Sequence, residues 1–149
     1  MCYGILSWGN ASHAQIQKVF LVQKAAMRGI VKANRREHCQ PIFQNLDVMT
    51  VYAVIIYENL RYIKRHKNLF RSSSEIHSHN TRHKSNLNQP RGRIDKTKII
   101  GIDLYNLPPL SITNLPIDLF ERKIKTFLKQ LAPYSINEFK THLNDNLSL

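Results

Sequence analysis

The sequence predicts an all-α protein, built from four or five helices packed as a small irregular bundle with a long basic loop. Three observations support this prediction. Apolar residues recur at helical spacing in two long segments, residues 13–32 and 117–131. Ser, Thr or Pro stands at the start of each candidate helix, as is typical of helix N-termini. With 149 residues, 42% of them hydrophobic and 21% charged, the chain has the composition of one globular domain, or of one domain with a tail.

Residues 1–70 form the first of three predicted parts, a basic helical segment. An extended or turning lead-in, residues 1–11, offers Tyr3, Leu6 and Trp8 for packing. Ser12 and Gln15 then make a capping box for an amphipathic helix over residues 13–32. The expected buried face of this helix consists of Ile16, Val19, Phe20, Met27 and Ile30, and Gln23 interrupts it. Leu21 and Val22 lie off that face, which indicates a second contact surface.

Two further elements complete this part. After a polar connector, Pro41 opens a short helical turn that runs through Leu46. Thr50 is a candidate cap for a longer helix through about His66. Its segment VYAVIIYENLRYI is apolar almost all round, so it is expected to be the most buried element. The β-branched residues in this run would equally suit a strand.

Residues 71–97 form the second part, a flexible basic linker or loop. They lack hydrophobic periodicity and are rich in Ser, Asn, His and Arg, so we expect partial disorder unless a partner binds.

Residues 98–149 form the third part, a C-terminal helical segment. A short apolar element of uncertain type, residues 98–107, stops at Pro108-Pro109. Pro116 then opens the clearest helix of the chain. Its apolar stripe consists of Ile117, Phe120, Ile124, Phe127, Leu128 and Leu131. Ser135 and Glu138 make a second capping box before a final helix over residues 136–144.

The formal charge of +12 predicts an anionic partner, which could be nucleic acid, an anionic membrane surface or an acidic protein. Residues 1–40 hold six basic and one acidic side chain, whereas residues 99–149 hold five of each. Lys24, Arg28 and Lys32 follow one another at a spacing of four residues. Like charges at that spacing cost a few tenths of a kcal/mol per pair, which an anionic partner would offset. A solvated basic face is the alternative.

The basic loop adds arginine and lysine without aromatic side chains, a composition that fits phosphate contact better than base stacking. We therefore predict nonspecific contact with an RNA or DNA backbone. The predicted contact residues are Lys18, Lys24, Arg28, Lys32, Arg35, Arg36, Arg82, Lys84, Arg91 and Arg93.

The sequence predicts no catalytic site and no cofactor. It has no P-loop, GxGxxG, GxSxG or HExxH motif, and its acidic residues are scattered. His77, His79 and His83 are close together, but they lack the second pair of ligands that zinc usually has, so no metal site is expected. Two cysteines give no disulfide framework and indicate an intracellular, nuclear or cytoplasmic protein that is not secreted. No apolar run approaches the roughly 18 residues of a membrane span.

Seven short segments in order resemble the C-terminal region of reverse transcriptases from insect-type non-LTR (LINE-like) retrotransposons. They are YGILSWG, IQKVFLVQKAAMRGI, REHCQPIFQNLDVMTV, IHSHNTRHKSNLNQPR, GIDLYNLPP, FERKIKTFL and YSINEF. By this resemblance Tyr3, Gly4, Trp8 and Gly9 match a lead-in motif, Lys24 and Arg28 a basic helix, and His77, Thr81 and Arg82 a loop motif. His79 stands where that loop usually has tyrosine.

The resemblance implies a segment at or beyond the polymerase thumb, C-terminal to the palm. The palm motif with its metal-binding aspartates is absent from the sequence, so the chain is expected to be a noncatalytic nucleic-acid-binding fragment of an RNA-directed DNA polymerase. The palm and fingers domains of the parent polymerase are further expected partners. Met1 is then an internal methionine of a longer ancestral frame.

Two alternatives stay open. Residues 1–36 contain six basic residues, no acidic one and an amphipathic helix, which also describes a mitochondrial targeting segment or a membrane-surface protein. The chain could also be an inert translated relic.

Overall fold

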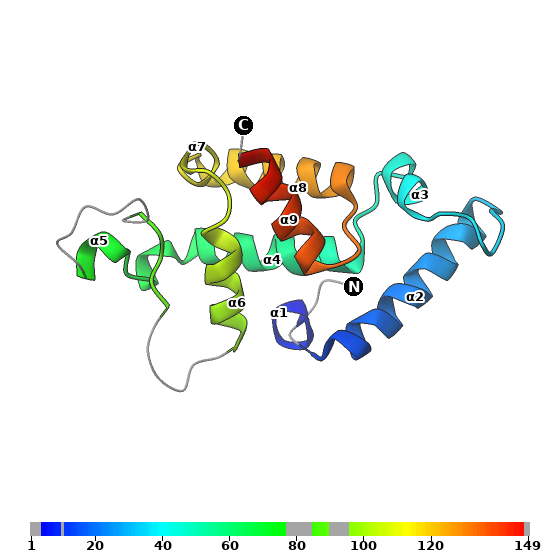
Figure 1. Ribbon diagram of the computed structural model, residues 1–149, viewed down its shortest axis with the longest axis horizontal. Helices are drawn as coiled ribbons and strands as arrows, with labels where there is room; N and C mark the ends of the chain where they lie inside the picture. Colours follow the sequence, from blue (N-terminus) through cyan, green and yellow to red (C-terminus); the bar gives the residue numbers. More distant parts are fainter. Residues whose placement is uncertain (1–3, 10, 77–84, 90–95, 148–149) are drawn as a thin grey trace.

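Helix α4 (Val51–Arg65) lies at the centre of the structure, and five other helices, α1, α2, α6, α8 and α9, pack against it (Figure 1). The computed structural model describes residues 4–9, 11–76, 85–89 and 96–147, except for the side chains of Ile76, 96–98 and 144–147. Before α4 come α1 (Ile5–Trp8), α2 (His13–Ile30) and α3 (Gln40–Asn45). After it come a 3-10 turn (Lys67–Leu69), α5 (Ser73–Ile76), α6 (Lys96–Tyr105), α7 (Leu110–Thr113), α8 (Ile117–Leu131) and α9 (Ile136–Leu147). The all-α prediction is confirmed.

The start of α4 is fixed by two polar side chains. Thr50, which is fully buried, accepts a hydrogen bond from Ala53 N at 3.1 Å and donates one to the Pro133 carbonyl at 2.7 Å. Gln23 of α2 accepts from Val51 N at 2.8 Å and donates to the Met49 carbonyl at 2.9 Å. The predicted cap is therefore confirmed, and Gln23 interrupts the apolar face of α2 because it serves this helix start. The strand alternative for this segment is wrong.

Helix α4 contributes to two hydrophobic clusters, one on each side. One cluster joins it to α6, α8 and α9 through residues such as Leu60, Ile102 and Phe120. The other joins it to α1, α2 and α3 through residues such as Ile55, Phe20 and Phe43. Residues of the predicted parts 1–70 and 98–149 thus pack together in both clusters.

The crossing of α6 over α4 is close at Gly101. A Cβ atom on Gly101 would lie 3.0 Å from Cγ1 of Ile63, closer than side-chain carbons normally approach. The element of uncertain type over residues 98–107 is thus helical through Tyr105, as part of a helix that begins at Lys96 and packs closely on α4.

Helix α2 begins as predicted but ends early. Ser12 N donates to Oε1 of Gln15 at 3.2 Å, as expected of the capping box. The helix ends at Ile30, so the predicted extension to Lys32 is wrong. The prediction that Ile30 belongs to the buried face is also wrong, because Ile30 is 66% exposed. Both predictions fail because the helical spacing of apolar residues does not show where the chain leaves the helix axis.

The C-terminal helices follow the predicted pattern. Pro116 precedes α8, which buries Phe120, Ile124 and Leu128. The chain leaves α8 at Ala132, a buried residue with φ 44°. Glu138 N donates to the Ser135 hydroxyl at 3.0 Å, and the Glu138 carboxylate accepts from Tyr134 N. Helix α9 runs to Leu147, beyond the predicted end at residue 144.

Two segments expected to be irregular contain ordered elements. Residues 5–8 of the lead-in form α1, and the predicted loop contains α5 and the start of α6. Leu87 is buried, and its N–H and C=O groups both pair with the Asn106 side chain at 2.9 Å. This apolar anchor was overlooked because a single Leu has no periodicity. The predicted contact residues Arg82, Lys84, Arg91 and Arg93 lie outside the described residues.

Candidate nucleic-acid interface

The predicted basic row on α2 is already engaged in packing. The Lys24 ammonium lies over the rings of Phe20, at 5.4 Å, and Tyr134, at 4.9 Å. The Arg28 guanidinium donates twice to the Glu37 carbonyl, from Nε at 2.9 Å and from Nη2 at 2.7 Å. Lys32 lies past the helix end with φ 54° and is exposed. The three residues therefore do not form one continuous row of free cations on a helix.

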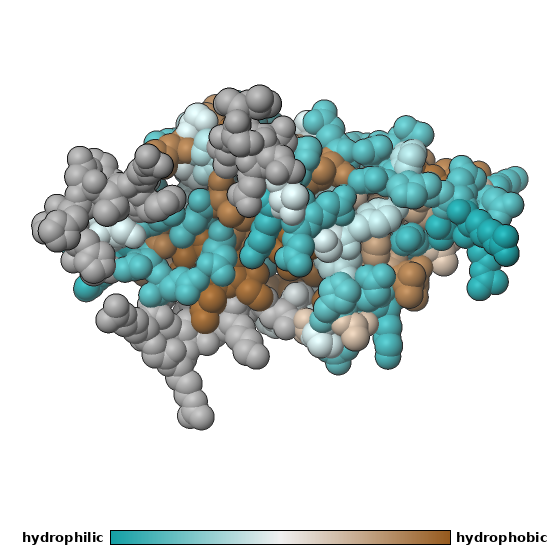
Figure 2. All heavy atoms as spheres, in the orientation of Figure 1, coloured by the Kyte–Doolittle hydropathy of each residue, from teal (hydrophilic) through white to brown (hydrophobic). Residues whose placement is uncertain are grey.

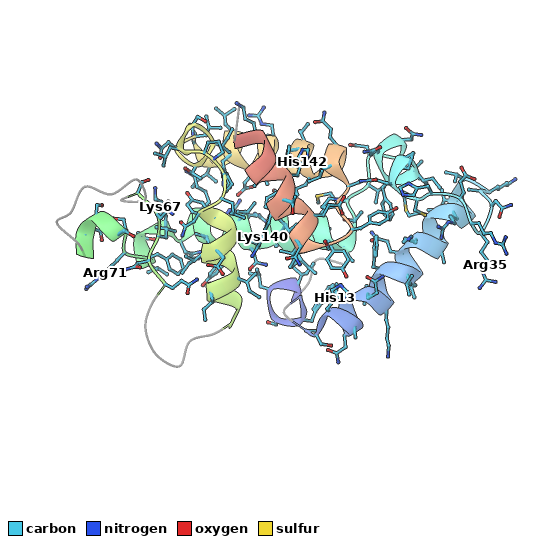
Figure 3. The ribbon with its side chains drawn as sticks, in the orientation of Figure 1. His13, Arg35, Lys67, Arg71, Lys140 and His142 are labelled. Atoms are coloured by element: carbon cyan, nitrogen blue, oxygen red, sulfur yellow. The ribbon has the colours of Figure 1, made fainter. Side chains whose placement is uncertain are left out.

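The connector between α2 and α3 presents its arginines outward. Asn34 N donates to the Glu37 carboxylate at 3.2 Å, and Glu37 N donates back to the Asn34 carbonyl at 3.0 Å. Together with the two bonds from Arg28, these contacts fix the turn. Arg35 and Arg36 are exposed on it, and Figure 3 shows Arg35 at one extreme end of the molecule. Hydrophilic side chains predominate at this end (Figure 2).

Helix α8 carries a second set of cations, none of which is among the predicted contact residues. Arg122, Lys125 and Lys129 stand at i, i+3 and i+7, the spacing of one helix face. They line a hollow of about 420 Å³ between α3 and α8, together with Gln44, Asp47, Thr126 and Gln130. Gln44 Nε2 donates to the Gln130 carbonyl at 2.6 Å, and Lys129 pairs with Asp47. Arg122 and Lys125 are exposed.

These two basic regions flank α3. That short helix packs against both α2 and α8, and its exposed residues Pro41, Gln44 and Asn45 are neutral. We call Arg35, Arg36, Arg122 and Lys125 the α3-flanking cations. Among the described residues, none of the four has a carboxylate partner.

Other cations of the chain have structural partners. Arg65 Nε lies 2.7 Å and Arg61 Nε 3.4 Å from the same carboxylate oxygen of Glu121. The hydrogen bond from Arg65 holds the pKa of Glu121 below its usual range. Lys64 donates to the Thr113 carbonyl at 2.6 Å, and burial lowers its pKa. These three cations fasten α4 to α7 and α8.

Candidate metal ligands do not come together in the part of the chain that the structure describes. No group of three or more His, Cys, Asp or Glu side chains there could hold a metal ion. His77, His79 and His83 fall outside the described residues. Cys39 is buried, and its thiol lies 3.5 Å from the Lys24 carbonyl.

In the part of the chain that the structure describes, no helix has both the length and the apolar character needed to cross a membrane.

Lys18 completes the set of predicted contacts and is exposed on α2. Of the ten predicted residues, the structure therefore places Lys18, Lys32, Arg35 and Arg36 on the surface, and gives Lys24 and Arg28 intramolecular partners.

Comparisons of the chain with protein families, with curated proteins and with solved structures found no match.

Proposed function

We propose that this chain is a noncatalytic nucleic-acid-binding fragment, related to the C-terminal region of a non-LTR retrotransposon reverse transcriptase, that contacts the phosphate backbone without reading sequence. The observation that carries the proposal is the group of α3-flanking cations, which have no carboxylate partner among the described residues. Exposed cations on both sides of a neutral helix, with no carboxylate partner among the described residues, suit a polyanion, because each phosphate contact releases condensed counterions.

The neutral polar surface of α3 supports the same proposal. A backbone that crosses from the connector to α8 meets Gln44 and Asn45 in between, whose amides can donate to phosphate oxygens. The Asp47 carboxylate, which would repel phosphate, is paired with Lys129. No aromatic side chain lines the hollow between α3 and α8 among the described residues, so a base has no ring to stack on there, and the expected binding is independent of sequence.

The salt dependence of binding tests this proposal. We would compare the double variants Arg35→Gln/Arg36→Gln and Arg122→Gln/Lys125→Gln with Lys67→Gln/Arg71→Gln. Lys67 and Arg71 are exposed and lie at the end of the molecule opposite Arg35 (Figure 3). The control therefore removes the same number of positive charges from a surface outside the α3-flanking cations. Fluorescence anisotropy with labelled single-stranded RNA and duplex DNA gives the affinity at several salt concentrations.

Each of the first two variants should reduce the slope of log affinity against log salt by about 1.4–1.8, since each phosphate contact contributes roughly 0.7–0.9. The control should leave the slope nearly unchanged. Equal reductions in all three variants would mean that binding depends only on net charge. Unchanged slopes in the first two would remove the α3 region from the interface.

Attachment to a membrane surface is the second candidate, and one observation favours it. Leu21 and Val22 on α2 are 54% and 67% exposed, on the same outer side as the exposed Lys18. Vesicles of phosphatidylcholine with and without phosphatidylserine provide the test. Val22→Gln should abolish binding to the anionic vesicles if this candidate is right, and should leave RNA binding unchanged.

A further inference from the structure

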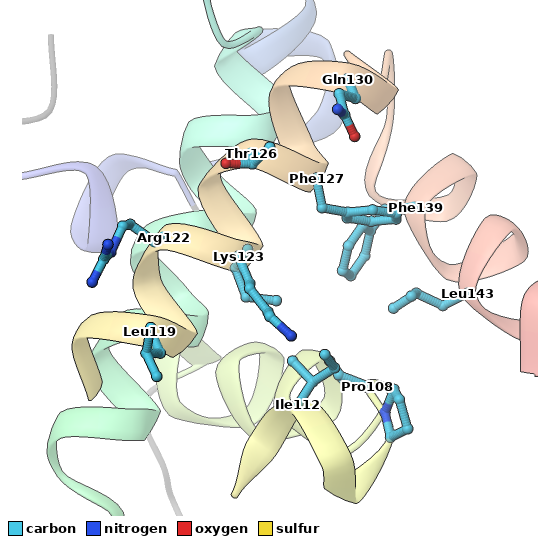
Figure 4. Close-up of a pocket in the computed structure, with 12 residues that line it drawn as sticks. Pro108, Ile112, Leu119, Arg122, Lys123, Thr126, Phe127, Gln130, Phe139 and Leu143 are labelled. Atoms are coloured by element: carbon cyan, nitrogen blue, oxygen red, sulfur yellow. The ribbon is translucent and has the colours of Figure 1, made fainter. Parts of the chain in front are cut away.

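A second hollow, on the other edge of α8, is lined mainly by apolar side chains. Its volume is about 640 Å³, and α7, α8 and α9 surround it (Figure 4). Phe127 and Phe139 lie in contact there, with ring centroids 6.2 Å apart, and Leu143 and Ile112 face the same space. We call this hollow the α8 groove.

The shape of the α8 groove suits a helix. Its α8 wall runs from Leu119 to Gln130, which corresponds to about 16 Å at 1.5 Å per residue. Apolar residues at i, i+4 and i+7 of a docked helix span about 10 Å, so two turns of such a helix fit along the wall. Leu119 is 42% exposed, which leaves apolar surface available for the partner.

The charge around the groove selects the kind of helix. Among the residues whose side chains the structure describes, Arg122 and Lys123 are the only charged ones that line it, and no carboxylate does so. Figure 4 shows Lys123 pointing into the space between α8 and α7. A helix with apolar residues on one face and Asp or Glu beside them would match both the groove and its cations.

We infer that the α8 groove binds an acidic amphipathic helix of a partner protein. This inference does not rest on the proposed nucleic-acid binding. The groove and the hollow between α3 and α8 lie on either side of one row of α8 residues, Arg122, Thr126 and Gln130, which line both, whereas Lys123 and the apolar side chains line only the groove. The groove offers pockets for apolar side chains, and Lys123 supplies the charge that orients the partner.

A designed peptide tests the inference. The probe is a fluorescein-labelled helical peptide of about 14 residues, with Leu at i, i+4, i+7 and i+11 and Glu beside this face. One control peptide has the same composition with the Leu positions scrambled, and another has Lys in place of Glu. Fluorescence anisotropy measures each peptide against the full chain and its variants, and circular dichroism verifies that each variant is folded.

Leu119→Gln and Lys123→Glu are the test variants, and Lys67→Glu, on an exposed residue away from the groove, is the matched control. Both test residues are exposed, so the fold should tolerate the changes. We expect saturable binding of the Glu peptide, at least about fivefold weaker with either test variant and unchanged with the control. Lys123→Glu should also improve binding of the Lys peptide.

Three results would overturn the inference. The first is equal binding of the scrambled and amphipathic peptides. The second is binding that Leu119→Gln and Lys123→Glu leave intact. The third is a concentration-dependent dimer that occupies the groove and excludes the peptide, detected by sedimentation, since the occupant would then be a second copy of the chain.

Discussion

Replacing Thr50 with Val should destabilise the fold strongly, because one hydroxyl serves two buried groups. Thr50 is fully buried, and its Oγ1 caps α4 through Ala53 N and donates to the Pro133 carbonyl. Loss of an N-cap typically costs about 1 kcal/mol. A buried carbonyl without its donor costs about 1–3 kcal/mol more. Because Val keeps the shape of Thr, no cavity adds to the sum, and we expect a loss of about 2–4 kcal/mol in the free energy of unfolding.

Urea denaturation followed by circular dichroism measures this loss, and Thr50→Ser is the matched control. Ser keeps the hydroxyl and removes only a methyl group, which costs about 1 kcal/mol. A typical domain has about 5–15 kcal/mol of stability, so the Val variant should still fold but melt about 5–15 °C lower. A Val variant as stable as the Ser variant would refute the reasoning, since the hydroxyl would then contribute nothing.

Three further predictions concern packing, pH and the basic helix. Phe120→Ala should cost about 3–5 kcal/mol in chemical denaturation because Phe120 is 1% exposed, and Phe127→Ala should cost less because Phe127 lines the open groove. Burial raises the pKa of Tyr105 to about 12. The unfolded chain therefore loses this proton first, and stability should fall as the pH rises from 10 to 12, with a shallower fall in Tyr105→Phe. Lys24→Gln should lower the melting temperature, through loss of its contacts with two aromatic rings, and should change the salt slope of RNA binding less than Arg122→Gln does.

Local signals predicted the starts of α2, α4 and α8, because capping is decided within a few residues. The capping residues at Ser12 and Thr50 and the proline before α8 were all recognisable from the sequence. The partners of Lys24 were not, since Tyr134 lies far along the chain and meets Lys24 only in the folded protein. The same limit explains why Leu87, isolated in a polar segment, was not recognised as a core residue.

The basic edge of α8 was missed for a different reason. The C-terminal part of the chain is neutral overall, because its acidic residues equal its basic ones in number. Glu121, however, faces Arg61 and Arg65 of α4, so it does not neutralise the outer face of its own helix. Counting charge by helix face, instead of by segment, would have revealed Arg122, Lys125 and Lys129.

Helix α8 allows the two proposed surfaces to be tested separately. Lys125 lines only the hollow toward α3, Lys123 lines only the α8 groove, and Arg122 lines both. If both proposals hold, Lys125→Gln weakens RNA binding alone, Lys123→Glu weakens peptide binding by at least about fivefold, and Arg122→Gln weakens both. If only the nucleic-acid proposal fails, the affinity for RNA is unchanged in Lys125→Gln, while the affinity for the peptide still falls in Lys123→Glu.

An acidic partner helix in the α8 groove would also bring negative charge beside the surface proposed for phosphate. The peptide should then reduce the affinity for RNA, and the Lys123→Glu variant should need at least about fivefold more peptide for the same reduction, because it binds the peptide more weakly.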